Sequence, residues 1–228
     1  MLMPHTTRYT LHATRIIIAL SVAFVLWTLM FSPWTAPYLP FWHCMVGSAV
    51  ILIALALYNG RLEIKQHLTF SSYKHFLTEV LLGIAIAAAL WGIFWLGDKI
   101  SQRMFPSFAR MQVDGIYGIK GGTNPVLLSC LLLLVIGPAE ELFWRGYVQQ
   151  TLTTLFQQKA RPAWVAALIA VAIYALVHIF SLNFMLIMAA CVCGVVWGGL
   201  YLLCPKHFPA ILISHALWDA AVFIWFPI

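Results

Sequence analysis

Charged side chains are scarce in this sequence. Only 9% of its 228 residues are Asp, Glu, Lys or Arg, whereas about 25% is usual for soluble domains. Just seven residues are acidic, and 63% of the chain is hydrophobic. This composition excludes an ordinary soluble domain. The basic residues are spread over the loops and do not gather with aromatic side chains, so no nucleic-acid-binding surface is predicted.

Cysteine is also sparse. All five cysteines lie within or at the ends of apolar segments, and their number is odd. Structural disulfides are therefore not expected. Cys191 and Cys193 are two residues apart, so on a helix they point in different directions and make a poor metal-binding pair.

Long apolar runs, by contrast, are frequent. Stretches long enough to cross a hydrocarbon core, which needs about 20 helical residues, lie at 16–33, 41–58, 79–97, 125–150, 162–180, 183–204 and 208–226. We predict an all-α integral membrane protein, a bundle of about seven transmembrane helices that forms a single polytopic domain over residues 1–228. No small-x-small cleavage site follows the first run, so we expect it to be retained as a span.

The distribution of lysine and arginine predicts the orientation of these spans. With the N-terminus inside, the inner loops carry Arg8, Arg15, Arg61, Lys65, Lys74, Lys159, Arg161 and Lys206. The outer side carries Lys99, Arg103, Arg110 and Lys120, all in one loop. Because positive charge accumulates on the cytoplasmic side, we predict a cytoplasmic N-terminus.

Five ionisable residues fall within or beside the last apolar runs: Glu140, Glu141, His178, His215 and Asp219. Ionisable groups inside membrane segments are costly and usually functional. We therefore take these five residues as the core of a candidate site among the last four helices.

The stretch GPAEELFWRGY, residues 137–147, carries two of them. Gly137-Pro138 is expected to interrupt or kink the fourth helix and to place both glutamates near a renewed helix N-terminus. Glu141 and Arg145 are four residues apart, the spacing of an intrahelical ion pair. Glu140 has no charged partner at that spacing, so it is the freer carboxylate and the better general base.

His178 and Glu140 lie at similar distances from the turn near residues 159–161, which predicts similar depths on neighbouring antiparallel helices. Tyr174, one helical turn before His178, is expected to bound the same pocket. His215 and Asp219 are four apart on the last helix, where the carboxylate can orient the imidazole. No serine or cysteine pairs convincingly with either histidine, so the residues favour water attack on a carbonyl over a covalent nucleophile.

Glu140-Glu141 with Arg145, an aromatic residue four before His178, and His215 four before Asp219 resemble the EExxxR, FxxxH and HxxxN/D motifs of the CPBP family of intramembrane proteases. This family includes the CAAX prenyl endopeptidases and the bacterial Abi proteins. The resemblance covers about residues 125–225. Tyr174 stands where phenylalanine is usual, and Asp219 where asparagine is commoner.

The resemblance implies an intramembrane endopeptidase that acts on a membrane-associated or lipidated protein or peptide. Glu140 and His178 would activate water, and His215 and Asp219 would bind or stabilise the oxyanion. Glu141, Arg145 and Tyr174 would support them. The family is described both as metalloproteases and as metal-independent glutamate proteases.

The residues leave the metal question open as well. Two histidines and carboxylates are suitable ligands for zinc, which would then be held by Glu140, His178 and His215, yet HExxH is absent and the donors lie on three separate helices. We favour catalysis that requires no cofactor, with zinc as the alternative.

Two other functions fit an intramembrane polar cluster. A non-catalytic scaffold or immunity protein of the same fold would be expected to lose motif residues, and none is lost here. A proton-coupled transporter would more naturally show an internal repeat and polar residues along a pathway. We predict a protease of the bacterial inner membrane whose partners are the lipid bilayer and a peptide or membrane-protein substrate.

Overall fold

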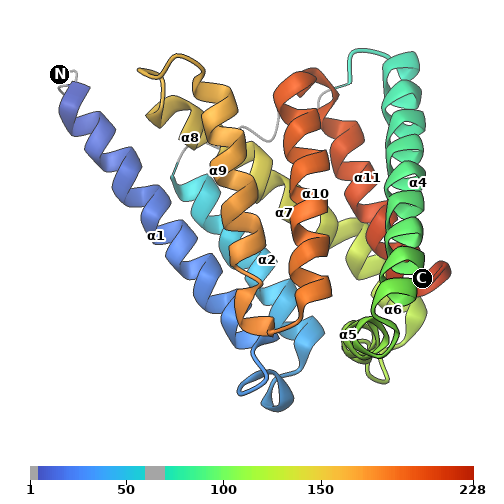
Figure 1. Cartoon of the computed structure of the whole chain (residues 1–228). Helices are drawn as coiled ribbons and strands as arrows, with labels where there is room; N and C mark the ends of the chain where they lie inside the picture. Colours follow the sequence, from blue (N-terminus) through green and yellow to red (C-terminus); the bar gives the residue numbers. More distant parts are fainter. Residues whose placement is uncertain (1–4, 60–69) are drawn as a thin grey trace.

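The structure, a computed structural model, describes residues 5–59 and 70–228. Every regular element in these ranges is a helix (Figure 1). Among the described residues, seven helices are long and apolar enough to cross a membrane: Thr10–Phe31, Phe41–Tyr58, Tyr73–Met104, Pro125–Leu155, Pro162–Ser181, Phe184–Leu203 and Pro205–Trp225. The predicted all-α fold with about seven spans is confirmed.

The first three spans are uninterrupted α-helices: α1 (His5–Phe31), α2 (Phe41–Tyr58) and α4 (Tyr73–Met104). A short 3-10 helix, η1 (Ala36–Tyr38), joins α1 to α2. The side chain of Ser72 caps α4 by accepting a hydrogen bond from the backbone N–H of His75. Arg61 and Lys65, two of the residues behind the predicted orientation, lie outside the described residues.

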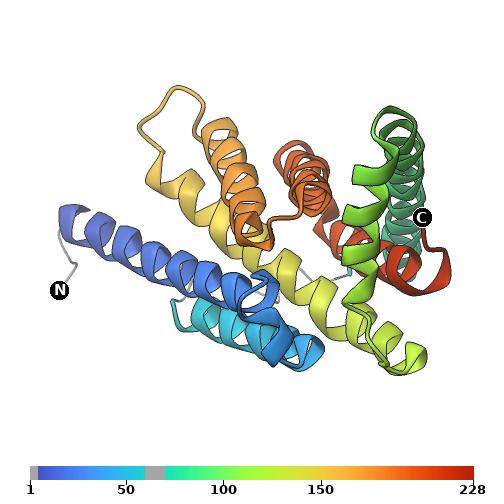
Figure 2. The same cartoon turned by 60° about the horizontal axis from the view of Figure 1, so that its bottom comes forward.

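Helix α5 (Pro106–Gly118) runs across the ends of the spans, so Figure 1 shows it nearly end-on and Figure 2 shows its length. The chain then turns into the fourth span through Asn124. The Asn124 side chain accepts from the backbone N–H groups of Val126 and Leu127, which caps the new helix.

The fourth span is one continuous helix that alternates between α and π geometry. It consists of α6 (Pro125–Leu131), η2 (Leu132–Ile136), α7 (Gly137–Glu141), η3 (Leu142–Gln149) and α8 (Gln150–Leu155), with η2 and η3 in the π form. The backbone N–H of Gly137 bonds to the carbonyl of Leu132, five residues back. The wider π turn accommodates Pro138 without ending the helix.

The expectation that Gly137-Pro138 interrupts the helix and gives Glu140 and Glu141 a renewed N-terminus is therefore wrong. Both glutamates lie in the middle of a continuous helical span. Gly137 has a packing role instead, because a Cβ atom placed there would lie 2.7 Å from the Cα atom of Ala216. The missing side chain lets the fourth span and the last helix approach closely.

The last three spans are α9 (Pro162–Leu176) with η4 (Ile179–Ser181), α10 (Phe184–Leu203), and η5 (Pro205–His207) with α11 (Phe208–Ala220) and η6 (Ala221–Trp225). The fourth and the last spans are the most buried of the seven. Helix α4 packs closely on α11, because a Cβ atom at Gly83 would lie 2.6 Å from the Cγ2 atom of Ile213. These two most buried spans carry Glu140, Glu141 and Asp219, the three acidic residues predicted for the site.

The turns alternate between the two ends of the bundle (Figure 1). The described N-terminal end of α1, the α8–α9 turn and the α10–α11 turn lie at one end, and the α1–α2 link, α5 and η4 lie at the other. This alternation is what seven successive crossings require.

Candidate active site

Glu141 lies at the centre of a buried ionic cluster. Its Oε1 atom accepts a hydrogen bond from Nη1 of Arg145 at 2.8 Å and lies 2.6 Å from Nδ1 of His215. All three side chains are buried, and that of Glu141 is fully enclosed. The structure contains the expected Glu141–Arg145 pair, and it adds a contact with α11 that the spacing of residues along the sequence does not reveal.

His215 lies between two carboxylates. Its Nδ1 atom contacts Glu141, and its Nε2 atom lies 3.5 Å from Oδ2 of Asp219, one helical turn later. With a carboxylate oxygen near each nitrogen, the doubly protonated ring is favoured, because only that form can donate at both positions. The ring also stacks on Trp197 of α10, with a centroid separation of 3.8 Å and an interplanar angle of 16°.

Ser214 is occupied by structural contacts. Its hydroxyl donates to the carbonyl of Ile211 at 2.7 Å and accepts from Nε1 of Trp197 at 3.0 Å. It therefore holds the tryptophan that stacks on His215. Neither contact of the Ser214 hydroxyl is with a histidine.

Glu140 projects from the same helical turn as Glu141 but has a different environment. Its Oε2 atom accepts a hydrogen bond from the hydroxyl of Tyr174 at 3.1 Å, and the residue is 8% exposed. The Arg145 guanidinium lies over the Tyr174 ring, 4.9 Å from its centre. Tyr174 is the residue that departs from the usual phenylalanine of the motif, and its additional hydroxyl bonds Glu140.

His178 lies just beyond the end of α9, in the turn that leads to η4. Its Nδ1 atom lies 2.9 Å from the carbonyl oxygen of Tyr174, and its Nε2 atom accepts a hydrogen bond from Nε1 of Trp27 at 3.2 Å. These two contacts select the neutral tautomer with its proton on Nδ1.

Tyr174 joins the two parts of the candidate site. Its hydroxyl contacts Glu140, and its carbonyl contacts His178, so all three lie at the same level of the bundle. The contact between α9 and the fourth span agrees with the depth that was counted from the turn between them. Within the described residues, no direct hydrogen bond joins His178 to Glu140 or to His215.

The arrangement does not form a metal-binding set. In residues 5–59 and 70–228, no three His, Cys, Asp or Glu side chains are placed to hold one ion. The Nε2 lone pair of His178 is occupied by Trp27, and Nδ1 of His215 faces Glu141. Glu140, His178 and His215 therefore do not fit zinc in this conformation.

Two tryptophans of the site were not predicted from the sequence. Trp27 belongs to the first span, yet it bonds His178, so the site is not confined to the last four helices. Trp197 stacks on His215 from α10. Neither residue is ionisable, and tryptophan is common in membrane helices, so no local signal distinguishes them from packing residues.

Glu79 is a further buried carboxylate that the sequence analysis passed over. It is fully enclosed on α4, where Oε1 lies 2.7 Å from Nδ1 of His207 and Oε2 accepts from the backbone N–H of Ala210 at 3.1 Å. It therefore caps the first turn of α11 from a neighbouring helix. Its position at the start of an apolar run was the signal that could have revealed it.

Comparison with known proteins finds a similarity over the part of the chain that carries most of these contacts. Residues 122–221 match the family model described as type II CAAX prenyl endopeptidase Rce1-like. The predicted resemblance to the CPBP family is confirmed. The Rce1-like segment contains all seven predicted site residues, whereas Trp27 and Glu79 lie outside it. The match supports endopeptidase activity in a membrane. The searches of curated proteins and of solved structures each found no match.

Proposed function

We propose that the protein is an intramembrane endopeptidase that hydrolyses a peptide bond in a membrane-associated or lipidated protein or peptide. The observation that carries this proposal is the contrast between two adjacent carboxylates. Glu141 is held by Arg145 and His215, whereas among the described residues Glu140 is held only by the Tyr174 hydroxyl. The Glu141 carboxylate therefore stabilises the fold, and the Glu140 carboxylate is available to accept a proton.

Glu140 is assigned the role of general base. It takes a proton from a water molecule as the water oxygen bonds to the carbonyl carbon of the scissile peptide. It then returns this proton to the leaving nitrogen as the C–N bond breaks. Tyr174 fixes one carboxylate oxygen, Oε2, which leaves Oε1 as the oxygen assigned to the water.

His178 is assigned to hold the attacking water together with Glu140. Its proton is fixed on Nδ1 by the Tyr174 carbonyl, so Nε2 is its accepting atom. In the structure this atom accepts from Trp27. For His178 to act, the Trp27 indole must share or release this contact when water enters.

His215 is assigned to the oxyanion that forms on the carbonyl oxygen. Its contact with Glu141 is short, at 2.6 Å, whereas its Nε2 atom lies 3.5 Å from Asp219. The loosely held Nε2–H is therefore the donor that can turn to the oxyanion. Asp219 keeps the ring charged and oriented, which an ionised carboxylate does even though it cannot itself donate to an oxyanion.

The proposal is tested by comparing the peptides released from membranes of cells that carry the intact protein or Glu140→Gln. The amide keeps the shape of Glu140 but removes the base, so released products should fall by at least about 100-fold. Asp98→Asn is the matched control, because Asp98 is a buried carboxylate of α4 that bonds Gln102 away from the cluster. Equal product patterns with intact protein and Glu140→Gln would favour a non-catalytic scaffold.

A further inference from the structure

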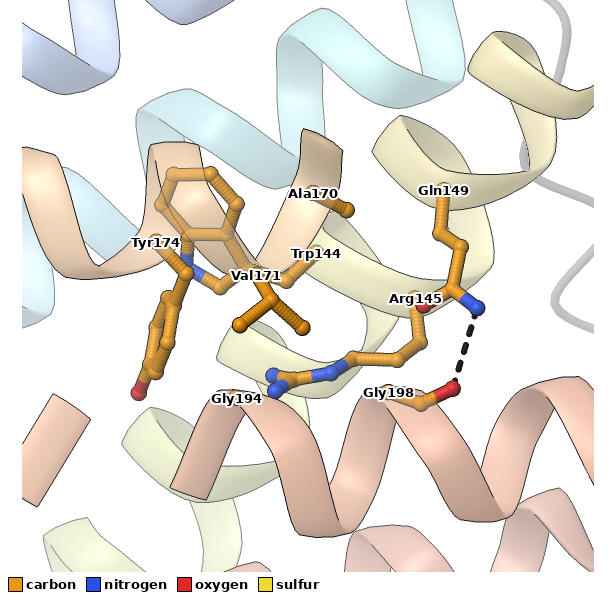
Figure 3. Close-up of a pocket in the computed structure, with 8 residues that line it drawn as sticks. All are labelled: Trp144, Arg145, Gln149, Ala170, Val171, Tyr174, Gly194 and Gly198. Carbon is orange, nitrogen blue, oxygen red and sulfur yellow. Dashed lines mark hydrogen bonds between the residues drawn. The ribbon is translucent and has the colours of Figure 1, made fainter. Parts of the chain in front are cut away.

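A small cavity lies beside the ionic cluster, enclosed by η3, α9 and α10 (Figure 3). Its volume is about 10 Å³, close to the roughly 10–15 Å³ that one water molecule needs. A water-sized molecule fits inside it. The Arg145 and Gln149 side chains reach across it toward Gly194 and Gly198 of α10 (Figure 3).

The walls of this cavity contain buried polar atoms that require partners. Oε1 of Gln149 and Nε1 of Trp144 are buried and make no hydrogen bond within the described residues. The amide nitrogen of Gln149 is already used, because it donates to the carbonyl of Gly198 at 3.1 Å. Arg145 donates to Glu141 through Nη1, and its guanidinium has further N–H groups that can donate.

These atoms define the chemistry of a ligand. Gln149 Oε1 requires a donor, whereas Trp144 requires an acceptor and Arg145 has N–H groups that can donate to one. An anion satisfies only the second demand, and it would add negative charge beside the carboxylates of Glu140 and Glu141. A small neutral molecule that both donates and accepts can bond Gln149 and Arg145 together, and water is the one that is always present.

The cavity shares two of its lining residues with the candidate active site. Tyr174 bonds Glu140, and Arg145 bonds Glu141. Water held in the cavity would therefore lie next to the carboxylates, within a bundle whose core consists mostly of apolar side chains. Hydrolysis inside a membrane requires a local supply of water, because the surrounding hydrocarbon provides none.

We propose that this cavity, formed around Trp144, Arg145, Gln149 and Gly198, is a water-binding site that supplies the hydrolytic reaction at Glu140. The proposal rests on the endopeptidase function proposed above. Water bound there bonds Gln149 and Arg145 between turnovers and passes along the Arg145–Tyr174 wall to Glu140 when a substrate is bound.

Two glycines of α10 provide a matched test. A Cβ atom at Gly198 would lie 3.4 Å from Oε1 of Gln149 and from Cγ2 of Val171, so Gly198→Ala fits but takes up space in the cavity. A Cβ atom at the adjacent Gly199 would meet nothing within 4 Å. Both changes raise helix propensity equally, so Gly199→Ala controls for effects on the helix. Gln149→Leu is a second test that removes the acceptor.

The first measurement detects the water directly. The full-length protein in lipid nanodiscs is exposed to an X-ray pulse, and hydroxyl-radical modification of Trp144 and Tyr174 is quantified by mass spectrometry. We expect modification in the intact protein and in Gly199→Ala. In Gln149→Leu, loss of one hydrogen bond to the water should reduce modification by about tenfold. Gly198→Ala should reduce it at least as much. Absence of modification in the intact protein would overturn the proposal.

The second measurement is kinetic and uses a peptide that the intact protein cleaves. Gly198→Ala should lower kcat by about tenfold, in line with the lost water contact, and leave KM unchanged for every substrate. Equal kcat in Gly198→Ala and Gly199→Ala would overturn the proposal. A rise in KM confined to substrates with large side chains would also overturn it, because the cavity would then be a side-chain pocket. If no peptide is cleaved, the labelling still decides whether water binds, so failure of the proposed function is distinguishable.

Discussion

Glu141 and His215 meet at 2.6 Å between the fourth and the last spans, and this contact joins two motifs that are 74 residues apart. Because Glu141 also accepts from Arg145, a single carboxylate balances a guanidinium and orients an imidazole. The contact lies beside the close approach of Gly137 to Ala216, where the two helices have no room for a larger side chain. Loss of any member of this cluster should therefore affect both the fold and the chemistry.

Arg145→Ala should lower the stability of the folded protein and not only its activity. Removal of the guanidinium leaves Glu141 buried with one fewer cation, and breaking a buried ion pair costs about 3–5 kcal/mol. We expect a lower folded yield and a lower thermal unfolding temperature in detergent. Arg103→Ala, an exposed change in the last turn of α4, is the control. Equal unfolding temperatures for the two variants would contradict the assigned role of Glu141 and Arg145.

Asp219 should tolerate asparagine better than leucine. Asparagine can still contact the ring and can donate an N–H to the oxyanion, so Asp219→Asn should keep measurable activity. Leucine removes every polar contact, and loss of an oxyanion-site group costs about 100-fold or more in kcat. Initial rates of the three proteins, normalised to folded protein, provide the measurement. Wild-type activity in Asp219→Leu would remove Asp219 from the mechanism.

Chelation should leave activity intact. The structure does not gather Glu140, His178 and His215 around one point, and His178 is engaged with Trp27. We therefore expect purified enzyme to retain its rate after exhaustive dialysis against a chelator, with well under one zinc per chain by elemental analysis. Loss of activity that zinc specifically restores would show instead that the three residues rearrange into a ligand set.

Glu79→Leu should destabilise the start of α11, although Glu79 itself lies on α4. The change removes the acceptor of the Ala210 N–H and the partner of His207. A buried donor without a partner costs about 1–3 kcal/mol. We expect a lower unfolding temperature and reduced activity, because His215 lies only one to two turns further along α11. Thr78→Ala, an exposed change on the same helix, should alter neither quantity.

The orientation of the bundle is testable by labelling. In a background without the five native cysteines, Gln158→Cys in the α8–α9 turn and Ser107→Cys on α5 place thiols at opposite ends of the bundle (Figure 1). With a cytoplasmic N-terminus, an impermeant thiol reagent added to intact cells should label position 107 and not position 158. Opening the cells should expose position 158. The reverse pattern would overturn the predicted orientation.

The sequence by itself determined the features that depend on local spacing. Seven apolar runs predicted seven spans because the width of the hydrocarbon core sets the helix length. The spacing of four residues predicted the Glu141–Arg145 pair and placed His215 beside Asp219, because helical periodicity brings such residues to one face. The order and spacing of the same residues also indicated the family.

Only the tertiary structure decided which faces of the helices meet. Trp27 contacts His178 across 151 positions of sequence, and Glu141 reaches His215 on another helix. Nor did the sequence reveal the π turns that carry Pro138 through the fourth span, because the proline rule considers one helix without its neighbours. The contacts between helices share one physical reason. Which residues of two helices touch depends on how each helix is rotated about its axis and on how closely the two axes approach at small residues such as Gly137 and Gly83. The packing of the whole bundle sets both the rotation and the approach.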